Sequence, residues 1–405
     1  MFKGKNIVLA VTGSIAAYKI ANLASMLMKQ HCKVTVMMTQ NATNFINPIT
    51  FETLTGNKCL VDTFDRNFQY SVEHVSLAKE TDVVLVAPAS ANVIAKMAHG
   101  LADDMLTTTI LACECKKIIA PAMNTHMYHN PIVQDNLKIL EKYGMEVIKP
   151  DYGYLACGDI GDGKMPSEET LFSYIEKEIA REKDLLGKKI LITAGPTREA
   201  IDPVRYITNH SSGKMGYAIA KSAMLRGADV TLISGVVDIK APNFVKVIPV
   251  LSAQDMFEAV KENYEQQDII IKAAAVADYT PEHVATEKVK KKEGDMSISL
   301  KRTQDILAFL GQNRKENQFL CGFSMETEHM LENSKAKLEK KNVDMIVANN
   351  LKQAGAGFGT NTNVVTFITR ENVKELPIMS KENVGHALLD EIIQKIEPNQ
   401  ENSSL

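Results

Sequence analysis

The sequence predicts an α/β protein made of two tandem, doubly wound domains, each with a parallel sheet. With 405 residues, the chain is long enough for two or three domains of roughly 150 residues each. Short apolar, β-branched runs alternate with amphipathic helical patterns, and this alternation is typical of βαβ units. The pattern starts a second time at residue 188, and no short-period repeat is visible. Each half is therefore expected to fold as its own Rossmann-like or flavodoxin-like domain.

The first half contains five predicted strands in one parallel sheet. The first strand, residues 6–12, ends at Gly13 and Ser14, and a helix follows over 15–29. Parallel neighbours need such a crossover helix between them. The other strands are expected at 33–38, 82–87, 117–120 and 146–148, and the other helices at 91–98, 104–112, 131–143 and 167–183.

The second half repeats this organisation, beginning with the strand at 188–193. The charged stretch 181–189 is the expected boundary, so the domains are predicted to be residues 1–186 and 187–405. The polar tail, 398–405, is expected to fray. Further strands are predicted at 229–234, 245–250, 269–276, 297–300, 319–322 and 345–348, with helices at 212–227, 253–265, 304–312 and 330–341.

The composition is that of an ordinary globular protein, with 45% apolar and 23% charged residues. The net charge of −3 provides no positive field for nucleic acid or an anionic membrane surface. No apolar run approaches the roughly 20 residues of a membrane span, and residues 1–14 are better explained as a first strand than as a signal peptide. The six cysteines lack C-x-x-C or zinc-type spacing, which predicts a cytoplasmic protein with reduced thiols.

Polar residues follow two of the predicted strands closely. Gly13 and Ser14 precede a helix, where backbone N–H groups suit a phosphate, although by themselves they are better explained as a tight turn. Ser90 and Asn92 follow the strand at 82–87, and they either line the sheet edge where ligands collect or cap the next helix. No G-x-G-x-x-G is present, which argues against a standard dinucleotide fingerprint.

Three more residues in the first half could take part in chemistry. Asn124 follows the strand at 117–120 and could hold a carboxylate or thiol-bearing substrate, or cap a helix. Cys157 lies in the glycine-rich segment 155–165, which predicts a mobile flap whose thiol could donate a proton. His74 could position or exchange a proton, although a lone histidine is more often structural.

Together these segments resemble the FMN-dependent cysteine decarboxylases, specifically phosphopantothenoylcysteine decarboxylase. The motifs cover nearly all of the first half and occur in order: GSIAAYK, MTQNATNF, His74, APASANVIAK, APAMN and LACGDIGDGKM. The resemblance implies a group of residues around FMN: Gly13, Ser14, Thr39, Ser90 and Asn92. It also implies an active site in which Cys157 is the proton donor and His74 and Asn124 are its neighbours. The flavin, a hydride acceptor, would supply the electron sink that loss of CO2 requires.

The connection over 192–216 is long and polar, and such loops inside compact domains are usually functional. Residues 211–213 open the next helix and offer an anion site, and Asn209 comes just before them. Arg198 and Arg205 could also reach a phosphate.

Charged residues also follow the strand at 269–276. Asp278 could bind a ribose hydroxyl or Mg²⁺ at the carboxyl edge of the sheet. Lys288 lies in the lysine-rich run 286–294, which is either a solvated face or a flap over a triphosphate.

Three residues near the end of the second half could complete a nucleotide site. Lys337 and Lys341 lie on one helical face and could reach a phosphate together, or else face the solvent. Phe323 could pack against a base or in the core.

These stretches are similar to phosphopantothenate–cysteine ligase, with NHSSGKMG, KAAAVADY, the lysine-rich run and CGFSMET as the distinctive segments. The order of the two halves matches the bifunctional bacterial coenzyme A biosynthesis proteins along essentially the whole chain. The resemblance implies CTP and Mg²⁺, with the metal near Asp278, and Asn209 as the residue that orients an acyl-cytidylate. It implies a set of CTP-binding residues that includes the catalytic Lys288: Lys272, Ala273, Ala274, Asp278, Lys288, Gln304, Asp305, Ile306, Leu307, Phe323, Lys337 and Lys341.

The expected function is CTP-dependent ligation of cysteine to 4′-phosphopantothenate, followed by FMN-dependent decarboxylation to 4′-phosphopantetheine. The resemblance also implies a homo-oligomer of trimers that can stack into a dodecamer, with paired ligase domains. Two alternatives stay open at this point. A flavin-binding regulatory protein would not need His74, Asn124 and Cys157 together, and a nicotinamide-dependent reductase would be expected to carry the missing G-x-G-x-x-G.

Overall fold

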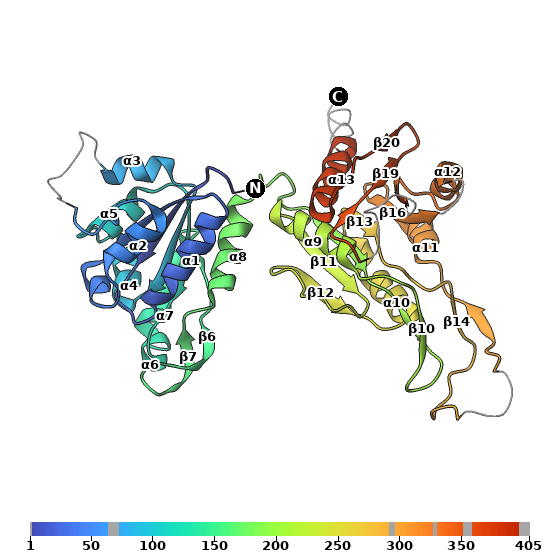
Figure 1. The fold of residues 1–405 in the computed structure, drawn as a ribbon, viewed down its shortest axis with the longest axis horizontal. Coiled ribbons are helices and arrows are strands. Elements are labelled where there is room, and N and C mark those ends of the chain that lie inside the picture. The colour runs from blue at the N-terminus through green and yellow to red at the C-terminus, as the bar shows by residue number, and fades with distance from the viewer. Residues whose placement is uncertain (1, 64–72, 291–295, 327–329, 351–358, 397–405) are drawn as a thin grey trace. The chain divides into compact units, whose positions relative to one another are not determined.

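The computed structural model describes residues 2–63, 73–290, 296–326, 330–350 and 359–396. The chain forms two compact units, Met1–Arg181 and Glu182–Leu405 (Figure 1). Each unit contains one large sheet with helices against it, which confirms the predicted doubly wound α/β class. The predicted tail at 398–405 lies outside the described residues.

The first unit is built on a five-stranded parallel sheet in the order β2-β1-β3-β4-β5. The central strand β3 is buried along all seven residues, as expected for a parallel strand covered on both faces. The strand order changes direction between β1 and β3, where a ligand crevice forms in such sheets. The strands are β1 (Asn6–Val11), β2 (Lys33–Met38), β3 (Val83–Ala89), β4 (Lys116–Pro121) and β5 (Glu146–Val147).

Helices cover both faces of this sheet in two groups. The first group consists of α1 (Ala17–Lys29), α2 (Pro48–Thr55) and α8 (Glu168–Ile179). In this group, α2 and α8 each pack against α1. The second consists of α3 (Glu73–Glu80), α4 (Ala91–His99), α5 (Met105–Ala112) and α7 (Pro131–Lys142). The short helices α2 and α3 were not predicted. Asn47 and Pro48 carried a usable signal for α2, because Asn47 caps the helix and Pro48 occupies its first turn.

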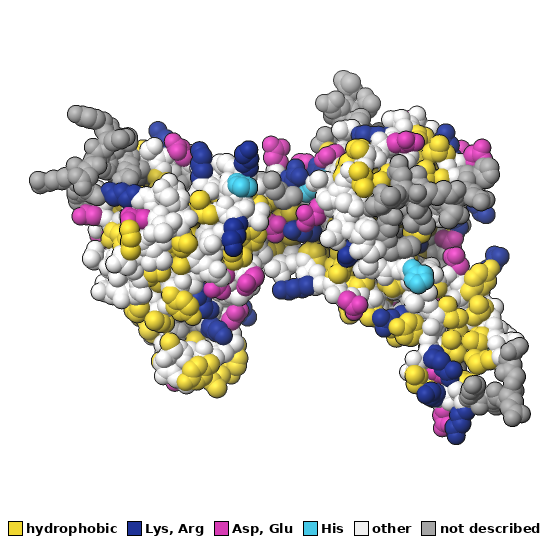
Figure 2. Space-filling view, in the orientation of Figure 1, with side chains coloured by type: hydrophobic (Ala, Val, Ile, Leu, Met, Phe, Trp, Pro, Cys, Tyr) yellow, Lys and Arg dark blue, Asp and Glu magenta, His cyan; other side chains and the backbone are white. Residues whose placement is uncertain are grey.

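Three smaller elements follow the strands β2, β4 and β5. They are a 3-10 helix, η1 (Gln40–Asn44), the one-turn helix α6 (Thr125–Tyr128), and the antiparallel hairpin of β6 (Asp151–Tyr154) and β7 (Ile160–Lys164). The hairpin occupies the segment predicted to be a flap. Figure 2 shows hydrophobic side chains at this end of the unit, and Tyr152 and Tyr154 are 71% and 69% exposed.

The second unit has an eight-stranded sheet in the order β12-β11-β8-β13-β16-β17-β19-β20. The first six strands are parallel, whereas β19 and β20 are antiparallel and were not predicted. The strands are β8 (Lys189–Ala194), β11 (Asp229–Ser234), β12 (Lys246–Pro249), β13 (Ile269–Lys272), β16 (Phe319–Glu326), β17 (Met345–Asn350), β19 (Val365–Ile368) and β20 (Val373–Glu375).

Five α-helices and three short two-stranded sheets complete the described part of this unit. The helices are α9 (Lys214–Leu225), α10 (Ala253–Asn263), α11 (Ile306–Asn313), α12 (Met330–Lys340) and α13 (Lys381–Ile396), and a 3-10 helix, η2 (Tyr264–Gln266), follows α10. The paired short strands are β9 (Arg198–Ala200) with β10 (Tyr206–Thr208), β14 (Tyr279–Pro281) with β15 (Leu300–Arg302), and β18 (Thr362–Asn363) with β21 (Met379–Ser380). No helix in the described residues is both long and apolar enough to cross a membrane.

Two predictions of strand bounds were wrong for a physical reason. The strand expected at 297–300 is instead β15, which pairs with β14 outside the main sheet. The strand expected at 269–276 ends at Lys272, because its pairing with β16 ends there, while the backbone beyond it stays bonded to the end of β8 and the loop that follows β8. The N–H of Ala273 donates to Thr193 O at 3.2 Å, and the N–H of Ala275 donates to Gly195 O at 3.0 Å.

A buried arginine ties together three parts of the second unit. Arg226 ends α9 and is 6% exposed. Its guanidinium pairs with both carboxylate oxygens of Asp184, at the start of the unit, and donates to Asp390 Oδ1 of α13 at 2.6 Å. It also donates to the carbonyl of His386 at 3.1 Å. This one side chain therefore holds the first turn of the unit and its last helix against α9.

Replacing Arg226 with Ala is expected to lower the free energy of unfolding of the second unit by about 2–3 kcal/mol, because charge-assisted hydrogen bonds to a buried group are lost. The measurement is calorimetric unfolding of the full chain. The control is Lys261→Ala, which removes an exposed ion pair of 4.0 Å with Glu258 and should change the stability by less than about 0.5 kcal/mol. Equal effects of the two substitutions would contradict the assignment.

Candidate functional site

The loops that follow β1, β2 and β3 meet at one edge of the first sheet, because these strands are parallel neighbours. Buried Thr12 links two of the loops: its hydroxyl donates to Pro88 O at 2.6 Å and accepts from the N–H of Ser90 at 2.9 Å. Gly13 lies so close to the third loop that a Cβ there would be 2.9 Å from Asn41 Cβ. Sequence reasoning missed Thr12, although a polar residue at the end of an apolar strand was a usable signal.

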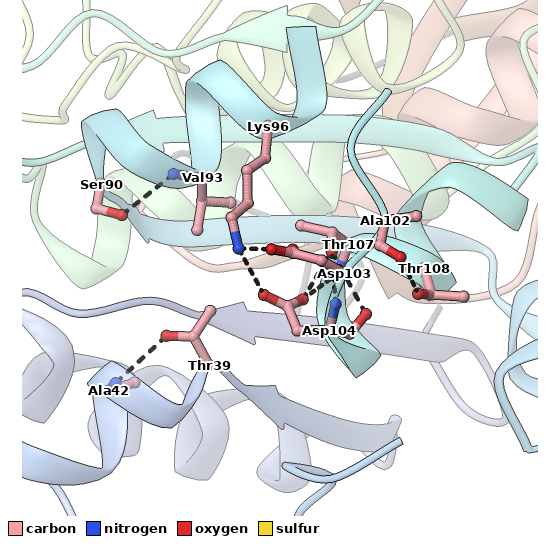
Figure 3. Close-up of polar contacts among 10 residues, drawn as sticks. All are labelled: Thr39, Ala42, Ser90, Val93, Lys96, Ala102, Asp103, Asp104, Thr107 and Thr108. Atoms are coloured by element: carbon pink, nitrogen blue, oxygen red, sulfur yellow. Dashed lines mark hydrogen bonds and ion pairs between the residues drawn. The ribbon is translucent and has the colours of Figure 1, made fainter. Parts of the chain in front are cut away.

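Thr39 and Ser90 both act as helix caps, as Figure 3 shows. The Thr39 hydroxyl accepts from the N–H of Ala42 at 3.3 Å, and the Ser90 hydroxyl accepts from the N–H of Val93 at 3.5 Å. Helix α1, in contrast, has no side-chain cap at its start. The helix begins at Ala17, after Ile15 and Ala16, and the N–H of Ala17 donates to Ser14 O at 3.0 Å. The positive end of the helix dipole at this place suits a phosphate. Asn92 is exposed in the first turn of α4.

Lys96 fixes the far end of α4 to the start of α5 (Figure 3). Its ammonium lies 2.6 Å from Asp103 Oδ1 and 3.3 Å from Asp104 Oδ2. The hydrogen bond to Asp103 is the main reason that the pKa of Lys96 is raised. Asp104 also caps α5 by accepting from the N–H of Thr107 at 2.8 Å. This network holds the helix that Ser90 begins.

The hairpin β6–β7 brings Cys157 to Asn124. Gly163 makes this possible, because it has φ of +121° and a Cβ there would lie 2.2 Å from Met123 O. The N–H of Met123 donates to Gly163 O at 3.1 Å. Asn124 Nδ2 then donates to Cys157 Sγ at 3.4 Å, while its Oδ1 accepts from the N–H of His126 at 2.8 Å. Asn124 therefore caps α6 with one amide atom, as one of the two interpretations of the sequence expected, and its other amide atom faces the Cys157 thiol. Its role in holding a substrate stays a prediction.

Asp159 also contacts both residues, and sequence reasoning missed it. Its Oδ2 accepts from Asn124 Nδ2 at 2.9 Å and from Cys157 Sγ at 3.3 Å. The signal was present, since Asp159 stands two residues after the cysteine in the segment predicted to be a flap. His74 lies in α3, but its side chain is outside the described residues. Its predicted role stays a prediction.

Cys157 differs from the other cysteines by its exposure. Cys157 is exposed, Cys115 is partly buried, and the remaining four are buried. Burial raises the pKa of Cys32 to about 11 and that of Cys59 to about 12, so these thiols are poor proton donors and nucleophiles. Cys157 is therefore the cysteine of this chain that a substrate can reach most readily.

In the second unit, a cavity of about 440 Å³ lies at the carboxyl edge of the sheet. Its walls bring together nine of the twelve residues predicted to bind CTP, and Tyr279, Arg302 and Thr303 also contribute. The nine are Lys272, Asp278, Gln304, Asp305, Ile306, Leu307, Phe323, Lys337 and Lys341.

This cavity is strongly cationic. Burial and the neighbouring Lys337 lower the pKa of Lys272. Lys341 forms an ion pair with Asp305, which caps α11 through the N–H of Ala308 at 2.9 Å. Although burial opposes it, the hydrogen bond from Lys341 keeps the pKa of Asp305 below its ordinary value. Burying neighbouring lysines costs solvation and electrostatic free energy, and a polyanionic ligand would offset that cost.

A second cavity of about 460 Å³ shares two residues, Asp278 and Phe323, with the first. It is lined by residues 209–216, which include the start of α9, and by Ala273 and Ala274. Asn209 Nδ2 donates to Ala275 O at 3.3 Å and Val276 O at 3.1 Å, which fixes the amide beside the cavity.

The same cavity contains two lysines. Lys214 Nζ donates to Gly359 O at 2.7 Å, and Lys381 Nζ donates to Thr360 O at 2.7 Å. Burial and the nearby Lys214 lower the pKa of Lys381 to about 8. A bound anion would stabilise both ammonium groups, so this cavity also favours a phosphate or carboxylate.

Lys288 lies outside both cavity walls, on an exposed segment. Its neighbour Val289 is anchored to a buried carboxylate, because its N–H donates to Asp202 Oδ2 at 3.1 Å and its carbonyl accepts from Arg205 at 2.5 Å. Arg205 also pairs with Asp202 at 2.6 Å, and Arg198 lies over the Tyr206 ring at 4.7 Å. Figure 2 shows lysine and arginine side chains near β10 and β14, in the part of the unit that carries this segment.

The described residues contain no group of three or more His, Cys, Asp or Glu side chains that could hold a metal by themselves. Asp278 is the carboxylate common to the two cavities. A single carboxylate is sufficient for Mg²⁺ when substrate phosphates supply the other ligands.

Comparison with known proteins identifies relatives of both units. Residues 1–180 match the family model described as Flavoprotein, and residues 185–396 match the model described as DNA/pantothenate metabolism flavoprotein C-terminal domain. A solved structure, the C-terminal domain of a coenzyme A biosynthesis bifunctional protein CoaBC, is 45% identical, covers 54% of this chain and 100% of its own, and has a TM-score of 0.47.

The match to curated proteins extends over nearly the full length. The coenzyme A biosynthesis bifunctional protein CoaBC of Bacillus subtilis is 48% identical over 396 residues, which is 97% of each chain. The protein of the same name from Haemophilus influenzae is 42% identical over 392 residues, 97% of this chain and 98% of the relative. The chain therefore belongs to the family of bifunctional coenzyme A biosynthesis proteins.

Proposed function

We propose that this chain joins cysteine to 4′-phosphopantothenate with CTP and then decarboxylates the product to 4′-phosphopantetheine. The second unit would perform the ligation and the first unit the decarboxylation. The contact between Asn124 and Cys157, 3.4 Å long, carries the decarboxylase half. The paired cavities that share Asp278 support the ligase half.

The residues of the first unit fit FMN. The uncapped start of α1, next to Gly13, suits the phosphate, and the loops tied together by Thr12 place Thr39 and Ser90 at the same edge. When bound, FMN would supply the hydride acceptor that turns the substrate thiol into an electron sink for decarboxylation, and afterwards the hydride donor that restores the thiol of the product. Asn124 would orient the substrate, and the Cys157 thiol would deliver a proton to the carbon that lost CO2.

In the second unit, a free carboxylate needs activation because it is a poor acyl donor. The carboxylate of 4′-phosphopantothenate would attack the α-phosphate of CTP, forming an acyl-cytidylate and releasing pyrophosphate. Lys272, Lys337 and Lys341 would neutralise the charge that develops on the phosphates, and Mg²⁺ would bind between Asp278 and phosphate oxygens. Cysteine's amine would then displace CMP from an intermediate oriented by Asn209, with Lys288 reaching the phosphates from its exposed segment.

The assembly is proposed to be a homo-oligomer with trimers of the first unit and pairs of the second. Large apolar side chains beside the Gly13 and Thr39 loops support contacts between copies there, since Ile15, Tyr18 and Phe45 are 54%, 59% and 46% exposed. All six cysteines are free, which agrees with a cytoplasmic location.

The test is an assay with 4′-phosphopantothenate, cysteine, CTP and Mg²⁺ in which pyrophosphate and CO2 are followed separately. Pyrophosphate is expected to require CTP, whereas CO2 is expected from phosphopantothenoylcysteine without CTP. Absence of both products from folded, FMN-loaded protein would reject the proposal.

Replacing Cys157 with Ser is expected to retain FMN and ligation while completed decarboxylation falls by at least about a hundredfold, because a serine hydroxyl is a far weaker acid than a thiol. The measurement is the yield of 4′-phosphopantetheine relative to CO2. The control is Cys115→Ser, since Cys115 precedes β4 and so lies at the amino edge of the sheet, away from the ligand edge. Normal product yield from Cys157→Ser would exclude Cys157 as the proton donor.

Replacing Lys341 with Gln is expected to raise the KM for CTP about tenfold, because a charge-assisted contact to phosphate is lost. Pyrophosphate release measures this effect, and decarboxylation of supplied phosphopantothenoylcysteine should stay unchanged. Lys340→Gln is the matched control, because Lys340 is the last residue of α12, directly before Lys341, and its side chain is exposed and lies outside the cavity wall. If the two variants have the same KM for CTP, Lys341 does not contact the nucleotide.

A further inference from the structure

Asp159, Asn124 and Cys157 form a closed triangle of hydrogen bonds. Asn124 Nδ2 donates to Asp159 Oδ2 at 2.9 Å and to Cys157 Sγ at 3.4 Å. The thiol in turn donates to the same Asp159 oxygen at 3.3 Å. The sulfur therefore uses both its donor and its acceptor capacity, and one carboxylate oxygen receives both donors.

The backbone of the hairpin tip holds this carboxylate in place. The carbonyl of Asp159 accepts from the N–H of Leu155 at 2.8 Å, and the carbonyl of Leu155 accepts from the N–H of Gly158 at 3.0 Å. The Leu155 side chain is 7% exposed, so the tip is anchored in the unit while Cys157 itself is exposed. The backbone at this tip is fixed, but an exposed cysteine side chain can still change rotamer unless a neighbouring group holds it in one orientation.

We propose that Asp159 is the positioning residue for the proton-donating thiol of Cys157, an inference that rests on the proposed decarboxylation. In the resting enzyme its carboxylate accepts the S–H hydrogen and fixes the orientation of the sulfur. In the reaction the S–H bond breaks and a carbon–hydrogen bond forms on the enethiolate, which leaves a Cys157 thiolate and a thioaldehyde. The hydride that the cofactor took from the substrate would then return to the thioaldehyde and restore the product thiol, and water would reprotonate Cys157.

This role is separate from the role of Asn124. Asn124 Nδ2 is the group that a substrate carboxylate or thiol would engage, and its Oδ1 is already used by the N–H of His126. When Nδ2 turns to the substrate, the contact between Cys157 and Asp159 still orients the thiol. Asp159 acts through Cys157 and is not itself the proton donor.

The test compares Asp159→Asn with Asp162→Asn in the full FMN-loaded chain. Asp162 is a matched control because it lies on the same hairpin, but its Oδ2 is 2.9 Å from His129 Nε2. In a single anaerobic turnover by Asp159→Asn, CO2 release from phosphopantothenoylcysteine is expected to stay near the wild-type rate, while formation of 4′-phosphopantetheine slows by about tenfold to a hundredfold. Asp162→Asn should leave both rates unchanged.

Alkylation of Cys157 provides a readout that a purely structural effect would not move in the same direction. With iodoacetamide at pH 7, and mass spectrometry of the Cys157 peptide, Asp159→Asn should react several-fold faster than wild type, because the sulfur is released from its hydrogen bond to the carboxylate and is free to attack. Asp159→Glu should return the rate toward wild type, since it restores a carboxylate acceptor.

Two results would overturn the proposal: unchanged product formation in Asp159→Asn, or alkylation that is no faster than in wild type. Failure of the proposed function is distinguishable, because wild-type protein would then release no CO2 from phosphopantothenoylcysteine. The alkylation rates would still report whether Asp159 controls the thiol.

Discussion

Both sites depend on one constraint, which is that neighbouring parallel strands end at the same edge of a sheet. In the first unit, β1, β2 and β3 deliver Gly13, Thr39 and Ser90 to one edge, and buried Thr12 links the loops that follow β1 and β3. In the second unit, the strand order reverses between the paired strands β8 and β13, and residues that follow these strands line the cavities. Residues far apart in the sequence therefore meet at these edges, because the strands bring the loops that follow them to the same place.

Several side chains at these edges perform structural and chemical work with different atoms. Thr39 and Ser90 cap helices through their hydroxyl oxygens, and Asn124 caps α6 with Oδ1 while Nδ2 faces Cys157. Capping fixes the rotamer of each side chain before a ligand arrives, so less conformational entropy is lost on binding. A cap and a ligand contact are therefore compatible functions of one residue at a strand-to-helix turn.

The two units manage charge in different ways. The first unit presents a helix start without a side-chain cap for a phosphate, and an exposed thiol beside an amide and a carboxylate. The second unit concentrates lysines in its cavities, where Asp305 forms an ion pair with Lys341. This difference agrees with one phosphate on the proposed cofactor of the first unit and a triphosphate in the second.

The sequence by itself determined the α/β class, the two-unit organisation and most main strands, because β-branched runs and helical periodicity are local properties. The positions of Asp278 after an apolar strand and of Cys157 in a glycine-rich segment were visible in the sequence, whereas the nine residues that line one cavity were expected as a set only from the resemblance to a known family. Only the tertiary structure decided that Asp159 contacts Cys157, that Thr12 links two loops, and that β19 and β20 run antiparallel. Those features depend on which segments meet in space, and strand pairing, glycine-permitted contacts and burial of single polar groups leave little trace in local sequence patterns.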